Sequence, residues 1–215
     1  RASNKGLHRV AVRHVPDLIS DTPLVIAFAR LVMISGDSQR LHEEIITAGG
    51  YIREGRFKRM DKVSDVQEAI EAASDREPSE EMKQRLMAMW DQVRDPLTRS
   101  LETRMKERAE GVGKLLTERE WKETVDIQKV MNELAVSIER ELDRPEYQQV
   151  TLAFPNFSDS EREQLNANVD FLRLRLEQIP KELEKEKAII KARYANPSPR
   201  MFPVAVMFLV PGKMK

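Results

Sequence analysis

The chain has 215 residues, of which 33% are charged and 6% aromatic, with equal numbers of acidic and basic side chains. This length suits one large domain or two small ones, and the composition is typical of long charged helices with a modest core. The lack of cysteine excludes disulfides and cysteine-based zinc sites, and no apolar run approaches the roughly 18 residues of a membrane span. We therefore predict a cytoplasmic protein that does not enter a membrane.

Charge is distributed unevenly along the chain. Residues 1–60 carry ten Lys or Arg against six Asp or Glu, and residues 200–215 carry three against none. Since the totals are equal, the middle of the chain is net acidic, which indicates two modules with different surfaces. The sequence does not begin with Met, and from this we expect a fragment cut or processed from a larger protein.

The first sixty residues are predicted to form strands. Residues 7–15 alternate apolar and basic side chains before Pro16, and residues 23–35 form an aliphatic run typical of a central strand. A third strand is expected at 41–48. Turns or breaks are predicted at Gly36-Asp37, at Gly49-Gly50, and at Glu54-Gly55 as a tight hairpin.

Residues 61–95 are predicted to form short linking helices, because the apolar period changes there from two to about 3.6. Ser64 to Gln67 fits a capping box for the first of them. Pro78-Ser79 precedes two glutamates and is expected to start the second.

Residues 96–199 are predicted to form a long antiparallel helical hairpin, a coiled-coil-like arm. The first helix is expected from Pro96, which kinks or begins it, to Leu142. Residues 111–113 and a shift of the apolar seam at Trp121 and Val125 predict a bend or loosened turn. Its expected seam comprises Leu97, Leu101, Met105, Val112, Leu116, Ile127, Met131, Leu134, Ile138 and Leu142.

The second long helix is expected to start at a capping box formed by Ser158 and Glu161, and to kink at Pro180. Its apolar residues follow a heptad seam: Leu165, Val169, Leu172, Leu176, Ile179, Leu183, Ile190 and Tyr194. The short connector around Pro145 favours internal antiparallel pairing over an intermolecular coiled coil.

Residues 201–210 form an apolar strand that requires burial, most simply beside residues 23–35. The fold class that we predict is therefore α+β: a small antiparallel sheet formed by both chain ends (1–60 and 200–215), with the helical hairpin inserted.

One basic cluster is a candidate nucleic-acid site: Arg53, Arg56, Lys58 and Arg59 lie beside Tyr51 and Phe57. Basic residues among aromatics can hold a phosphate backbone, but the same pattern is typical of a strand edge protected by charge. No phosphate-binding loop, nucleophile elbow or paired-carboxylate site is present, and the three histidines lack metal-site spacing. We therefore predict neither catalytic nor metal-binding residues.

Two stretches carry a family resemblance: RLHEEIITAGG (40–50) and RYANPSPRMFPVAVMFLVP (193–211). With the charged helices between them, they resemble the C-terminal region of bacterial Swi/Snf-like helicases of the DEAD/DEAH type, including the DrmD-type helicases of DISARM phage-defence systems. The resemblance covers residues 24–211.

The resemblance implies a parent that hydrolyses ATP with Mg on duplex DNA, with its ATPase lobes before residue 1. The family's nucleotide-binding motifs match no position here, so no catalytic residue and no cofactor is carried over. We expect a non-catalytic accessory domain that acts as a rigid arm, positioning the helicase lobes or docking a partner protein. The alternatives are a DNA-binding module using the basic cluster and an independent structural coiled-coil protein.

Overall fold

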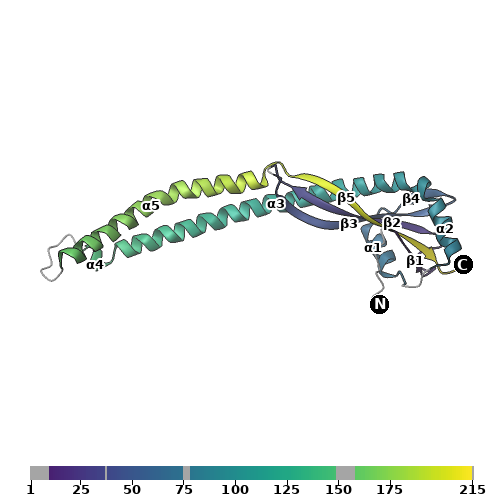
Figure 1. Cartoon of the computed structure of the whole chain (residues 1–215), viewed down its shortest axis with the longest axis horizontal. Coiled ribbons are helices and arrows are strands. Elements are labelled where there is room, and N and C mark those ends of the chain that lie inside the picture. Colours follow the sequence, from purple (N-terminus) through teal and green to yellow (C-terminus); the bar gives the residue numbers. More distant parts are fainter. Residues whose placement is uncertain (1–9, 37, 75–77, 149–157, 215) are drawn as a thin grey trace, which may run out of the picture. The chain divides into compact units, whose positions relative to one another are not determined.

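The computed structural model describes residues 10–36, 38–74, 78–148 and 158–214. Its contacts divide the chain into two compact units (Figure 1). The sheet unit comprises Arg1–Gly113 and Pro197–Lys215, and the helical unit comprises Lys114–Asn196. One long helix, α3 (Trp90–Leu142), contributes residues to both.

The sheet unit contains one five-stranded sheet, in the order β1-β5-β2-β3-β4. The C-terminal strand lies between the two N-terminal strands β1 and β2, so both chain ends build the sheet, which confirms the predicted α+β class. The bounds of the strands are β1 Val10–Val15, β2 Leu24–Ile34, β3 Arg40–Arg53, β4 Arg56–Arg59 and β5 Ser198–Pro211.

The sheet is mixed, and in this it differs from the wholly antiparallel sheet that we predicted. Strands β2–β5, β2–β3 and β3–β4 pair antiparallel, but β1 and β5 pair parallel. The reason is geometric: β1 and β5 both run opposite to β2, so they run in the same direction as each other.

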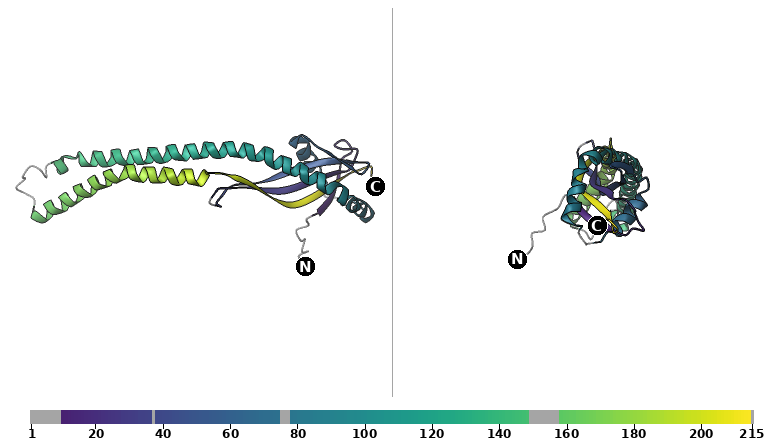
Figure 2. Two further views of the ribbon diagram at one scale, coloured as in Figure 1. Left: turned by 90° about the horizontal axis from the view of Figure 1, so that it is seen from above. Right: turned by 90° about the vertical axis from the view of Figure 1, so that its right-hand side faces the viewer.

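Strand β2 is central and is covered on both faces, as its aliphatic run predicted. Alternate side chains pack against helix α2 (Glu80–Ala88) and the start of α3 on one face, including Val25 and Leu31. The others, including Leu24 and Ile26, pack with helix α1 (Val63–Glu71) on the opposite face (Figure 2). A strand buried on both faces needs apolar residues at every position, not at alternate ones.

Strand β3 runs without interruption through Gly49-Gly50, so the predicted break is wrong. The glycines instead allow neighbouring strands to approach closely. A Cβ on Gly50 would lie 2.5 Å from the carbonyl oxygen of Lys58 and from the Phe57 ring. Strand glycines with such neighbours mark close backbone approach, not a turn.

The predicted hairpin at Glu54-Gly55 is confirmed. Arg53 pairs with Arg56 across it, and the two turn residues have φ angles of 50° and 71°. Positive φ at both positions is typical of the type I′ turn, whose twist matches that of the flanking strands.

The two short helices differ in how they begin. Helix α2 begins at Glu80, directly after the predicted Pro78-Ser79 start, and the Ser79 side chain caps it by accepting a hydrogen bond from the Met82 backbone. Helix α1 begins after Lys62 with no side-chain cap, and the Ser64 hydroxyl bonds to Asp65. The predicted capping box at Ser64 is therefore wrong, because Ser64 already lies in the first helical turn.

Helix α3 begins at Trp90, six residues before the expected start, and takes Pro96 inside it. It is helical throughout residues 111–113, without the loosened turn that we predicted. Val112 between the two glycines is fully buried, and this burial offsets the low helix propensity of its neighbours.

The helical unit is an antiparallel pair, in which α3 from Lys114 onwards lies beside α5 (Asp159–Tyr194) (Figures 1 and 2). This confirms the internal pairing. A short helix, α4 (Pro145–Gln148), follows α3, and the rest of the predicted connector, 149–157, lies outside the described residues. The capping box at Ser158 is confirmed. The Ser158 hydroxyl accepts a hydrogen bond from the Glu161 backbone N–H, and the Glu161 carboxylate accepts one from the Ser158 backbone N–H.

Helix α5 contains Pro180 and is visibly bent (Figure 1). An ion pair spans the proline: Arg175 Nη2 donates to Glu182 Oε2 at 2.8 Å, with a second bond between the same two groups. This pair bridges two helical turns around the position where proline removes a backbone donor.

Candidate functional site

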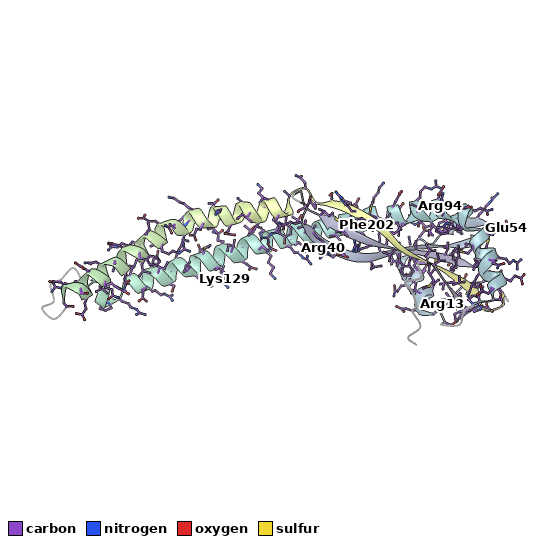
Figure 3. All side chains as sticks on the ribbon, in the orientation of Figure 1. Arg13, Arg40, Glu54, Arg94, Lys129 and Phe202 are labelled. Atoms are coloured by element: carbon purple, nitrogen blue, oxygen red, sulfur yellow. The ribbon has the colours of Figure 1, made fainter. Side chains whose placement is uncertain are left out.

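The basic cluster lies on the β3–β4 hairpin, whose turn residue Glu54 is labelled in Figure 3. Arg53 is opposite Arg56, and Tyr51 is opposite Lys58, so these four side chains share one face of the hairpin. Arg59 is opposite Gly50 and therefore lies on the other face. The structure brings together three of the four predicted residues and separates Arg59.

The contacts of the cluster follow this division. On the shared face, Arg53 lies over the Tyr51 ring, 5.6 Å from its centroid, and 3.7 Å from the Asp21 carboxylate. Lys58 on this face is exposed, as is Arg56. On the other face, Arg59 pairs with Glu107 of α3 at 3.2 Å. The face with three cations and one aromatic ring is the candidate nucleic-acid surface, and we call it the basic face.

The second candidate is the helical unit itself. The predicted seam residues of α5 are its least exposed apolar side chains, and Val169, Ile179 and Ile190 are buried. On α3, Leu116 and Ile138 are buried, and the seam residues between them are half-buried. Charged side chains cover the outer surfaces, such as Lys129 on the side of α3 that faces away from α5 (Figure 3). The seam is therefore confirmed on α5 and on α3 from Leu116 onwards. Its first α3 residues, Leu97, Leu101 and Met105, pack instead in the core of the sheet unit, to which α3 belongs as far as Gly113.

The predicted seam shift at Trp121 and Val125 is wrong, since Trp121 is 69% exposed and Val125 is 44% exposed. Between Leu116 and Ile127 the inward positions are taken by polar residues: Glu120, Glu123 and Thr124. The four-and-three spacing continues from Leu116 through these positions. Counting the spacing without requiring apolar residues would have identified them.

Glu123 joins the two helices and was missed by sequence reasoning. Its carboxylate accepts hydrogen bonds from Arg193 Nη1 at 3.0 Å and from the Tyr194 hydroxyl at 2.5 Å. Burial and the hydrogen bond to Glu123 raise the pKa of Tyr194 above its ordinary value. The end of α5 is thereby attached to α3 by a polar contact, in the part of the seam where the inward positions of α3 are polar.

This contact predicts a pH dependence for the helical unit. Because the native pKa of Tyr194 is raised, its protonated form is favoured in the folded state. The resulting stability is complete below the unfolded pKa of about 10 and is lost as pH rises through the native pKa. We expect the difference in unfolding free energy between the native chain and Tyr194→Phe to shrink from pH 8 to pH 11.

The measurement is urea unfolding followed by circular dichroism at each pH, with both chains in the same buffers. Other groups that titrate at high pH are common to both proteins and cancel in the difference. A difference that stays constant from pH 8 to pH 11 would contradict a stabilising bond between Tyr194 and Glu123.

A scan against protein-family models and searches of curated proteins and of solved structures found no match for this chain. Across the described residues, no cluster of three or more acidic or histidine side chains is arranged to hold a metal ion. In the same part of the chain, no helix combines the length and hydrophobicity needed to cross a bilayer.

Proposed function

We propose that this chain is a non-catalytic accessory domain whose helical unit acts as a rigid arm, positioning a motor or docking a partner protein. The observation that carries the proposal is the continuous seam, which keeps one phase from Leu116 to Ile138 and includes the Glu123 contact. Helix backbones satisfy their own hydrogen bonds, and a seam of fixed register resists sliding of one helix along the other. These are the properties that a spacer or lever needs.

For the parent, we propose a bacterial, cytoplasmic Swi/Snf-like DNA translocase of the DEAD/DEAH type that serves in phage defence. The support is the sequence resemblance of 40–50 and 193–211, which correspond to most of β3 and to the end of α5 with β5. ATP and Mg would bind to the parent's own lobes, since this chain carries no motif for them.

The test is a deletion in the full-length protein, with residues 114–196 replaced by a flexible Gly/Ser linker. A deletion that started at residue 97 would remove Leu97 and Leu101 from the core of the sheet unit, so the boundary matters. We expect DNA-stimulated ATP hydrolysis or partner binding to fall while the sheet unit keeps its thermal unfolding transition. Unchanged hydrolysis and unchanged partner binding would contradict the arm function.

A second candidate function is DNA binding by the basic face. The observation that favours it is that Arg53, Arg56 and Lys58 share a face with Tyr51, since cations that flank an aromatic ring suit phosphates and bases. The competing interpretation is charge that protects the edge strand β4 from aggregation.

The geometry provides a matched control for this candidate. We expect changing Arg53, Arg56 and Lys58 together to Ala to weaken binding of a duplex oligonucleotide at least about tenfold and to lower its salt dependence. Arg59→Ala removes the same charge type from the opposite face and should change affinity less than about twofold. Fluorescence anisotropy at several salt concentrations measures both. Equal losses of affinity for the two variant proteins, or no binding of the native chain at low salt, would exclude the basic face as a DNA-binding surface.

A further inference from the structure

Among the residues that the structure describes, the outer edge of β3 is mostly without a strand partner. Strand β4 pairs only with the last four residues of β3, from Gly50 to Arg53. Ile52 N donates to Pro23 O on the β2 side, whereas Gly49 O accepts from Met60 N on the outer side. Odd-numbered residues of β3 therefore direct their backbone groups outwards.

In the described part of the chain, these outward backbone groups have no strand partner at three successive odd positions: Glu43, Ile45 and Thr47. An unpaired row of N–H and C=O groups is a template for another strand. The other open edge of the sheet differs. Among the described residues, strand β1 pairs with β5 only from Val206 onwards, and the part of β5 before Val206 contains Pro199 and Pro203. Proline cannot donate, so that edge is protected and the β3 edge is not.

A cleft of about 570 Å³ lies along the unprotected edge. One of its walls is apolar and comes from α1 and the sheet face beneath it, with Val63 and Ile70 on the helix and Phe28 and Ile45 on the sheet. Ile45 is 58% exposed and Val63 is 46% exposed, although both are aliphatic. An apolar wall beside unpaired backbone groups is the arrangement of a peptide groove.

The opposite wall is formed by α3 and is charged. Arg108 donates to both carboxylate oxygens of Glu44, at 2.5 and 2.9 Å. Arg59 and Arg104 both pair with Glu107. Of these groups, Arg104, Arg108, Glu44 and Glu107 line the cleft, so its formal charges balance. The buried Nε of Arg104 has no hydrogen-bond partner among the described residues, and this unpaired donor favours an acidic or carbonyl-bearing ligand group.

The two walls also limit what kind of partner can bind in the cleft. Helices lie on both sides of the β3 edge, so the edge of a second sheet that carries its own helices would collide with α1 or α3. A single extended chain avoids this, because alternate side chains point to opposite walls.

We propose that the cleft binds an extended peptide segment of a partner protein, which adds a strand to the outer edge of β3 at residues 43–47. Apolar side chains of the peptide face α1, and acidic or polar side chains between them face Arg104 and Arg108. The peptide's backbone bonds supply affinity, and the walls select its sequence. This inference does not depend on the proposed arm function.

The premise is tested first in the free chain by amide hydrogen exchange, resolved residue by residue with NMR. We expect the amides of Ile45 and Thr47 to exchange at least about 100-fold faster than those of Ile46 and Ala48, which pair with β2. Uniform protection along 43–48 would show that the edge already has a partner and would overturn the proposal.

The binding test uses a phage-displayed library of random nine-residue peptides selected on the full chain. We expect enriched peptides with apolar residues at alternate positions and acidic residues between them, and we expect a bound peptide to protect the amides of Ile45 and Thr47. The absence of enriched peptides, or binding that leaves both amides unprotected, would overturn the proposal.

A pair of variants isolates the backbone contact. Thr47→Pro removes one outward N–H and should weaken binding of the selected peptide at least about tenfold, while Thr47→Val keeps the N–H and should change it less than about twofold. If Thr47→Pro does not fold, N-methylation of alternate peptide residues tests the same bonds from the ligand side. Affinity insensitive to N-methylation at every position would exclude strand addition.

Discussion

Replacing Gly50 by alanine is expected to lower the free energy of unfolding of the sheet unit by about 3 kcal/mol. The added Cβ would lie 2.5 Å from the carbonyl oxygen of Lys58 and 2.5 Å from the Phe57 ring. Because Lys58 is in β4 and pairs with Tyr51 beside the glycine, its carbonyl can retreat only if the hairpin opens. The strain therefore affects the strand pairing that positions the basic face.

The matched control is Gly113→Ala in helix α3, where an added Cβ has no neighbour within 4 Å. Alanine has the higher helix propensity, so this change should raise stability by up to about 1 kcal/mol. Urea unfolding, together with amide exchange in the two regions, measures both variants. If Gly50→Ala is as stable as the native chain, then the hairpin does not hold β4 this close to Gly50.

The elements that sequence predicted well are those whose pattern has one physical solution. The aliphatic run of β2 needs burial on both faces, and the apolar run of β5 predicted a strand beside it, so two strands far apart in sequence could be placed side by side. The burial that we predicted for residues 201–210 is wrong for the first half of that run, where Phe202 is 44% and Val204 is 46% exposed. The heptad seam of α5 likewise requires a partner helix, and the capping box at Ser158 fixes where the helix begins.

The elements that were missed are those where one residue type serves two purposes. Gly49-Gly50 predicted a break because glycine usually permits turns, but here it permits close packing of strands, which only the neighbouring strands reveal. Glu123 appeared to be a surface residue, because its partners Arg193 and Tyr194 lie 70 and 71 residues away in sequence. The basic cluster was identified as a group, but the pleat of β4 assigns Arg59 to the other face.

The parallel pairing of β1 and β5 was also beyond reach of local patterns. The alternation in β1 predicts a strand with two different faces, but it does not specify which strand lies beside it. Neighbour choice depends on how the chain crosses the sheet between Val15 and Leu24, and no residue pattern in that connection encodes it.

Replacing Ile138 by alanine is expected to destabilise the helical unit by about 2–3 kcal/mol. Ile138 is 6% exposed within the seam of α3, so the smaller side chain leaves a cavity between the two helices. A two-helix pair has little other apolar contact to compensate, and the loss should appear as faster amide exchange in α5 as well as in α3. A response confined to α3 would mean that Ile138 does not pack against the second helix.

Val136→Ala provides the control, because Val136 lies two residues from Ile138 on the same helix and is 42% exposed. The change removes apolar atoms that are partly solvated and replaces a β-branched residue with a better helix former. Its effect should therefore stay within about 0.5 kcal/mol of the native chain. The two substitutions lie on different faces of one helix. The difference between their effects on stability therefore shows which face of α3 packs against α5. Equal effects would mean that α3 presents a different face to α5, and the rigid-arm function that rests on this seam would lose its support.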